Sequence, residues 1–91
     1  MEMGLNAVFE ALSHPVRRRI LAILKAGPAS AGEIAAHFDI AKPTLSAHLA
    51  KLREAELVSV ERRGTTLIHH LNMSILEEAL SGFLAFREQD R

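Results

Sequence analysis

The chain of 91 residues contains no cysteine, and this absence excludes several kinds of chemistry at once. Disulfides, thiolate metal sites, cysteine nucleophiles and thiol redox sensing all need that residue. Long apolar runs are missing too, because no stretch approaches the roughly 18 consecutive apolar residues that suggest a membrane span. The first twelve residues lack the basic leader and the apolar stretch of a secretory signal, so we expect a cytoplasmic protein.

An excess of charge of one sign is also absent, since 11 basic residues balance 11 acidic ones. The distribution is nevertheless uneven. Between Ser13 and His70, nine basic residues stand against five acidic ones, a net charge of +4, and the two ends together carry −4. A basic centre between acidic ends indicates that the central part of the chain and its two ends have different functions.

The length and the apolar share of 48% fit one domain, which we expect to span residues 1–91. A domain this short buries only about 60% of the surface that its unfolded chain exposes. Much of its core is therefore left half covered, and a partner subunit is expected for this reason.

The spacing of apolar residues predicts helices through the first 55 residues. One helix ends before Pro15, and this proline begins the next, over about residues 15–26. Ser30 and Glu33 match a capping box, in which each side chain accepts a hydrogen bond from the other residue's backbone N–H. This pair predicts the start of a short third helix, and a fourth is expected over residues 42–55.

Beyond Glu56 the apolar period changes to about two, which predicts a β-hairpin. Its tip is the sequence Arg-Arg-Gly-Thr at residues 62–65, where Gly64 can take the positive φ that a tight turn requires. A last helix follows, capped by Asn72 or Ser74, and its apolar face is too wide for a lone surface helix. The expected fold class is mainly α with a small β-hairpin (α+β).

Two short helices joined by a tight turn, followed by a hairpin with a basic tip, are the order of a winged helix-turn-helix. On the fourth helix, Leu45, Leu49 and Leu52 lie within about 60° of one another and mark the buried side. The remaining surface offers short polar and basic groups that can approach DNA, with an ordinary solvated face as the alternative interpretation. The candidates on this helix are Lys42, Pro43, Thr44, Ser46, Ala47, His48 and Lys51, joined by Arg62, Arg63 and Thr65 at the hairpin tip and by Arg18.

From residue 11 to residue 84 the chain resembles the ArsR-type bacterial repressors. The resemblance is carried, in order, by ALSHPVRRRILAIL, by AKPTLSAHLAKLREAELV with its Ser-x-His-Leu-x-x-Leu pattern, and by ERRGTTLIHHLN. It implies a sequence-specific repressor that binds an inverted-repeat operator as a homodimer through its first and last helices. The expected interface residues are Leu5, Val8, Phe9, Leu12, Leu76, Leu80, Phe83 and Leu84, although an intramolecular core must account for some of these leucines.

The chain departs from the metal-sensing members of this family. It has no cysteine for thiolate sites, and residues 74–90 contain no histidine for the site on the last helix. It looks more like the metal-independent, SdpR-like autorepressors, whose FDI-x-KP stretch resembles residues 38–43. This likeness implies that no cofactor is needed, that the protein regulates its own gene, and that a membrane protein of the same operon relieves repression.

Two residues have competing interpretations. Arg17 falls between Leu21 and Leu24 around the second helix, which indicates a structural ion pair, whereas Arg18 points outward and is the better phosphate candidate. His48 lies on the flank of the leucine stripe. There, a partly buried histidine bonded to backbone and a contact to a base or phosphate are equally good interpretations.

The other histidines do not indicate a metal site within the chain. His14 and His37 lie near helix ends and are interpreted as caps. His69 and His70 are adjacent in a strand and so point to opposite faces, which prevents both from binding one metal ion within a chain.

Two other classes of function are alternatives to a repressor. An enzyme would need a nucleophile with a base or a pair of carboxylates in a pocket, and no such pattern occurs, so the protein is not expected to be an enzyme. A winged-helix module for protein contacts, or one that senses a small ligand between the dimer helices, is the second alternative. Such a module would tolerate neutralisation of Arg63 and Lys42, whereas a repressor would lose DNA affinity and salt dependence.

Overall fold

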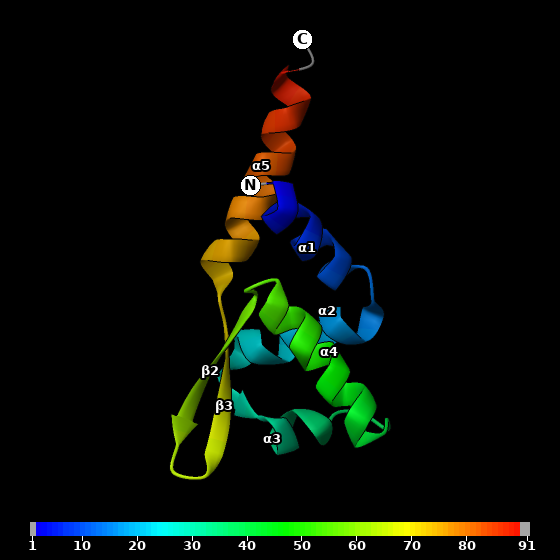
Figure 1. The fold of residues 1–91 in the computed structure, drawn as a ribbon, viewed down its shortest axis with the longest axis vertical. Helices are drawn as coiled ribbons and strands as arrows, with labels where there is room; N and C mark the ends of the chain where they lie inside the picture. The colour runs from blue at the N-terminus through cyan, green and yellow to red at the C-terminus, as the bar shows by residue number, and fades with distance from the viewer. Residues whose placement is uncertain (1, 90–91) are drawn as a thin grey trace.

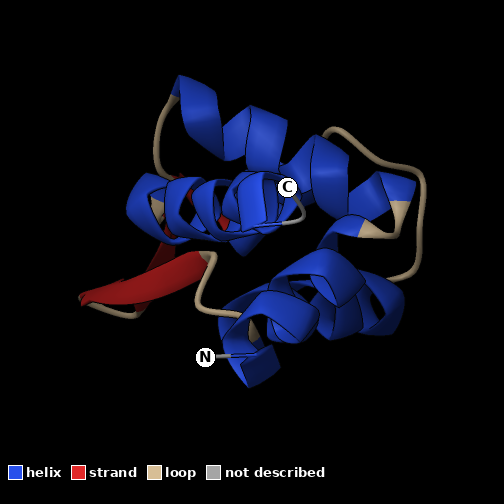
Figure 2. Ribbon diagram, turned by 90° about the horizontal axis from the view of Figure 1, so that it is seen from above, coloured by secondary structure: helices blue, strands red, loops and turns tan. Residues whose placement is uncertain are grey.

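Helices make up most of the chain, and a small sheet lies to one side of them (Figures 1 and 2). The computed structural model describes the backbone of residues 2–89 and the side chains of residues 4–85. The elements in chain order are α1 (Glu2–Leu12), α2 (Pro15–Ala26), β1 (Ala29–Ser30), α3 (Ala31–Ala35), α4 (Lys42–Glu54), β2 (Val58–Arg63), β3 (Thr66–Leu71) and α5 (Met73–Gln89). These bounds confirm the predicted helices and hairpin. No helix among the described residues is long and apolar enough to cross a membrane.

The starts of α2 and α3 follow from their first residues. His14 caps α2, because its Nδ1 accepts a hydrogen bond from the backbone N–H of Val16 at 3.1 Å, as predicted. The capping box is also confirmed: the N–H of Glu33 donates to Ser30 Oγ at 3.1 Å, and the N–H of Ser30 donates to Glu33 Oε1 at 2.8 Å. The prediction for His37 is wrong, because the C-cap of α3 is Ala36, and the bond from His37 to the carbonyl of Ile34, at 3.0 Å, comes from its backbone N–H.

The sheet contains one strand more than the predicted hairpin. It is antiparallel, in the order β1-β3-β2. The strand β1 pairs with β3 through Ala29 opposite His69 and Ser30 opposite Ile68. Two residues are too few to show an alternating pattern, so the sequence gives no signal of this strand. Its effect is to join the start of α3 to the middle of β3.

Two residues with positive φ set the direction of the hairpin. Glu56, with φ of 62°, follows the end of α4 and lets the N–H of Leu57 bond back to the carbonyl of Leu52 at 3.0 Å. The chain then enters β2 directly. Gly64 turns the hairpin at its tip with φ of 62°, as predicted, where a side chain would be strained.

The core lies where the helices meet the sheet. Its largest fully buried side chains are Ile20, Ile34, Leu52 and Leu57. The predicted leucine stripe of α4 is confirmed, because all of its members are buried in this core. Val8, expected at a partner interface, is only 2% exposed and belongs to the protomer's own core, which corrects that expectation.

Candidate nucleic-acid interface

The start of α4 presents backbone N–H groups that no side chain caps. The residue before the helix is Ala41, which has no group to accept them, and the first turn contains no acidic side chain. Such a helix start carries positive partial charge and attracts anions, phosphate among them. The candidate residues opposite the leucine stripe are exposed here: Lys42, Pro43, Thr44, Ser46, Ala47 and Lys51.

The hairpin tip is basic, but its charge is partly paired. The Arg63 guanidinium donates to both carboxylate oxygens of Glu61 at 3.3 Å, and Arg62 Nε donates to the Gly64 carbonyl at 3.2 Å. Glu61 also lies 2.9 Å from His70 Nε2. The hydrogen bond from Arg63, followed by that from His70, lowers the pKa of Glu61 below its usual value. Any phosphate that Arg63 binds must therefore displace Glu61 from its guanidinium.

A groove between α4 and the hairpin adds a residue that the sequence analysis missed. Its lining consists of Ser30, Ala31, Gly32, Ser46, Leu49, Arg53, Thr65, Thr66, Leu67 and His69. Arg53 follows Ser46 by seven residues, or about two helical turns, so both lie on the same side of α4. The seven-residue spacing in the sequence is enough to predict that Arg53 and Ser46 share this side of the helix. Hydroxyl groups and a guanidinium beside one another suit the backbone of a nucleic acid.

His69 lies under the hairpin and is only 2% exposed, whereas His70 on the opposite face bonds to Glu61. The predicted opposite orientation is confirmed. His69 Nδ1 lies 3.3 Å from the Ala29 carbonyl and so links β3 to β1. Burial lowers the pKa of His69, the bond to the Ala29 carbonyl partly opposes this shift, and the nearby positive charge of Arg53 adds to it.

The lowered pKa of His69 makes the fold sensitive to acid. Below the ordinary histidine pKa of 6.5, the unfolded chain binds a proton that the folded chain resists, so the free energy of unfolding falls as pH decreases. Urea unfolding at pH 7 and pH 5 should therefore show lower stability at pH 5, and His69→Gln should reduce this difference. The matched control is His37→Gln, which replaces an exposed histidine. If His69→Gln keeps the full pH dependence of the wild type, this account of His69 is wrong.

Arg17 is structural, but it does not form the predicted ion pair. Its Nε donates to the Ala11 carbonyl at 2.8 Å and its Nη2 to the Glu10 carbonyl at 3.1 Å, both in the last turn of α1. Its Nη1 lies 3.2 Å from His48 Nδ1. His48 is half-buried, which agrees with the interpretation of a partly buried histidine. Its hydrogen-bond partner, however, is the Arg17 side chain rather than backbone. Arg18 is exposed and donates to the Leu12 carbonyl.

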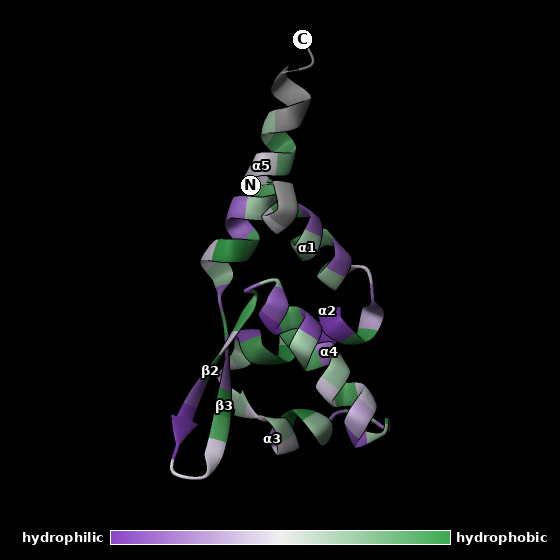
Figure 3. Cartoon of the chain, in the orientation of Figure 1, coloured by the Kyte–Doolittle hydropathy of each residue, from purple (hydrophilic) through white to green (hydrophobic). Residues whose placement is uncertain are grey.

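Away from the start of α4 and the hairpin tip, α5 presents large apolar side chains at its surface. Leu80, Phe83 and Leu84 are 44%, 56% and 55% exposed, and in Figure 3 green hydrophobic segments alternate along this helix with purple hydrophilic ones. The ring of Phe83 meets that of Phe9 edge to face, with centroids 5.4 Å apart. The other expected interface residues, Leu5, Leu12 and Leu76, are half-buried.

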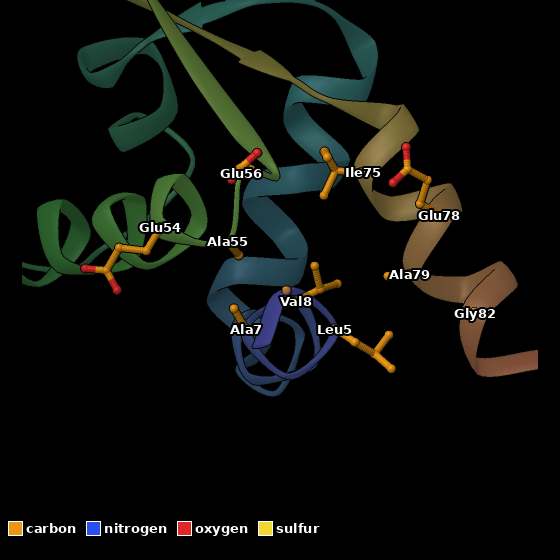
Figure 4. A pocket seen from close by; sticks show the side chains of 11 residues that line it. Leu5, Ala7, Val8, Glu54, Ala55, Glu56, Ile75, Glu78, Ala79 and Gly82 are labelled. Atoms are coloured by element: carbon orange, nitrogen blue, oxygen red, sulfur yellow. The ribbon is translucent and has the colours of Figure 1, made fainter. Parts of the chain in front are cut away.

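A groove of about 410 Å³ separates α1 from α5 beside this surface. Figure 4 shows Leu5 and Val8 of α1 facing Ile75 and Ala79 of α5 across it. Among the described residues, no group of three or more histidine, aspartate or glutamate side chains is arranged to hold a metal ion.

Comparison with known proteins agrees with this geometry. A family described as a helix-turn-helix domain matches residues 12–61. The transcriptional repressor SdpR of Bacillus subtilis is 44% identical over 82 residues, which cover 90% of this chain and 91% of that protein.

Solved structures share the fold. The crystal structure of an ArsR family transcriptional regulator matches 98% of this chain and 91% of its own, with a TM-score of 0.87 and 28% identity. The solution structure of a homodimeric winged helix-turn-helix DNA-binding domain from Mycobacterium bovis matches 94% of this chain and 81% of its own, with a TM-score of 0.75 and 24% identity. These structures confirm the predicted fold class, a winged helix-turn-helix.

Proposed function

This chain belongs to the ArsR-type family of winged helix-turn-helix transcriptional repressors, and on that premise we propose that it binds an inverted-repeat operator as a homodimer. The observation that carries the proposal is the exposed start of α4. Its leucine side is fixed in the core, its other side is exposed, and its N–H groups have no side-chain cap. A helix held in this way can enter the major groove with its first turns toward the bases.

Each part of the DNA-facing surface has its own task in this proposal. Ser46 and Thr44 offer hydroxyl groups to base edges, and Ala47 offers a methyl group to thymine. The basic side chains hold the phosphates. They are Lys42 and Lys51 on α4, Arg62 and Arg63 at the hairpin tip, Arg18 on α2, and Arg53 in the groove that also contains Thr65.

The dimer in this proposal forms through α1 and α5. Leu80, Phe83 and Leu84 supply the exposed apolar contacts, together with the half-buried ring of Phe9, and Val8 is left out because the protomer's own core buries it. A twofold axis between the protomers sets the two α4 helices against successive major grooves, about 34 Å apart. An inverted repeat with half-sites about one helical turn apart follows from this geometry.

We propose further that the operator lies upstream of the protein's own gene and that repression needs no metal ion. The likeness to SdpR supports the first part. The second part is supported by the absence of cysteine from the sequence and by the absence of a suitable cluster of ligands among the described side chains. A repressor of this kind acts on the chromosome, so a cytoplasmic location belongs to the same proposal.

Footprinting on the DNA upstream of the gene tests this function. Hydroxyl-radical cleavage should reveal two protected half-sites related by a dyad, with centres about 10 base pairs apart. The pattern should be the same with and without a chelator. Protection of one half-site alone, or none at low salt, would contradict the proposal.

A further inference from the structure

Three elements meet at Arg17. Its guanidinium donates to the carbonyls of Glu10 and Ala11, at 3.1 Å and 2.8 Å, and these belong to the last turn of α1. The same group lies 3.2 Å from His48 Nδ1 on α4. One side chain on α2 therefore links the end of α1, which leads to the proposed dimer surface, to the helix that is proposed to read DNA.

The link to α4 requires a neutral imidazole. An arginine has donors only and stays charged, so His48 Nδ1 must accept the hydrogen bond. Neutral His48 then carries its proton on Nε2. A second proton, added at Nδ1, would remove the acceptor and set a second cation against Arg17.

The surroundings of His48 add to this requirement. The ring of His14, from the junction of α1 and α2, lies 4.4 Å away between centroids. Lys51 on α4 also carries a positive charge, and the carboxylate of Glu10 on α1 faces it at 3.8 Å. The positive charges of Arg17 and Lys51 thus outnumber the one carboxylate. Burial, then the charges of His14 and Arg17, lower the pKa of His48.

We propose that Arg17 and His48 are positioning residues for operator recognition, and that they hold α4 in register with α1 only while His48 is neutral. The inference rests on the proposed function. Two recognition helices must keep a fixed spacing and orientation to match both half-sites, whereas non-specific binding to phosphates tolerates loose orientation. Loss of the link therefore lowers the preference for operator over scrambled DNA more than it lowers binding to DNA in general.

The link can be tested without DNA. Nitrogen-15 NMR of the histidine side chains identifies which ring nitrogen carries the proton. At pH 7.5 the expected result is His48 with its proton on Nε2, and Arg17→Met should shift the population toward the other tautomer. A wild-type His48 with its proton on Nδ1 would overturn the inference.

Operator preference is the functional test. The ratio of affinities for operator and scrambled duplexes is measured at pH 7.5 and pH 5.5 at constant ionic strength, with circular dichroism confirming the fold at each pH. The wild-type ratio should be lower at pH 5.5 than at pH 7.5, with a full loss of about tenfold once His48 is protonated, since a hydrogen bond from a charged donor is lost. His48→Gln keeps an acceptor and cannot be protonated, so its ratio should not change with pH.

Arg17→Met and Arg19→Met form a matched pair at pH 7.5, because both remove one positive charge from α2. Arg19 lies over the ring of Phe38 at 5.1 Å rather than against α4. Arg17→Met should lower the ratio about tenfold and Arg19→Met should not. The inference would be refuted if the two variants had the same ratio of operator to scrambled affinity and the wild-type ratio did not change with pH.

The outcomes separate this inference from the function on which it rests. If the wild type shows no preference for the operator at pH 7.5, the proposed function fails, and the NMR result still decides whether the link exists. If Arg17→Met does not fold, the wild-type pH series and the pH series of His48→Gln decide the inference.

Discussion

Replacement of Phe83 by aspartate is expected to yield monomers that bind the operator at least about a hundredfold more weakly than the dimer. A dimer that has bound one half-site holds its second protomer close to the other half-site, and a monomer has no such advantage. Phe83 is 56% exposed in the protomer and packs edge to face on Phe9. In a twofold dimer, one substitution removes two aromatic contacts and places two carboxylates in an apolar surface. Such carboxylates lose their hydration without gaining a partner.

Ser81→Asp is the matched control for this variant. It adds the same charge to an exposed position of α5, about half a turn away from Phe83. Sedimentation velocity should show Phe83→Asp as a monomer and Ser81→Asp as a dimer, and anisotropy should show weak operator binding by the first alone. A dimeric Phe83→Asp with full affinity would mean that the interface lies elsewhere.

Neutralisation of Lys42 and Arg63 together is expected to flatten the salt dependence of operator binding. A dimer of the double variant Lys42→Gln/Arg63→Gln loses about four phosphate contacts, so the slope of log K against log salt should fall by about 3 to 4. Affinity at low salt falls with it. The measurement is a series of anisotropy titrations across salt concentrations.

Glu61→Gln should change operator affinity in the opposite direction to the double variant. It removes the carboxylate that pairs with Arg63 at 3.3 Å and takes one negative charge away from the DNA-facing hairpin. Operator affinity should therefore rise. An unchanged salt slope in the double variant would contradict the assignment of Lys42 and Arg63 to phosphates and would favour a module for protein contacts.

Local spacing in the sequence predicts much of this fold for a physical reason. The cap of α2, the capping box of α3 and the leucine stripe of α4 all depend on residues a few positions apart. Gly64 is predictable for the same reason, since a tight turn needs its conformation. These features require no knowledge of the tertiary structure.

Features that depend on distant residues are not predictable in this way. Arg17 and His48 are 31 positions apart, so no local pattern shows that they meet. β1 pairs with β3 across 40 positions through only two residues. Val8 shows a different limit: helical spacing marks it as apolar but does not tell a protomer's core from a partner's surface.

The candidate site also contains features that local spacing predicts and one that depends on distant residues. The exposed side of α4 follows from its leucine stripe, and Arg53 follows from its seven-residue spacing to Ser46. Glu61 and Arg63 are two apart on a strand and so share a face, which makes their pairing predictable too. The addition of His70 to this pair depends on the register between β2 and β3, which spacing alone does not define.

Sequence-specific binding of DNA by a dimer can be measured by fluorescence anisotropy, with DNA from upstream of the protein's own gene and with scrambled DNA, across a salt series. We expect tight binding to the first DNA at one dimer per site, with affinity that falls steeply as salt rises, and much weaker binding to the second. Equal affinity for both DNAs, or no binding even at low salt, would contradict it.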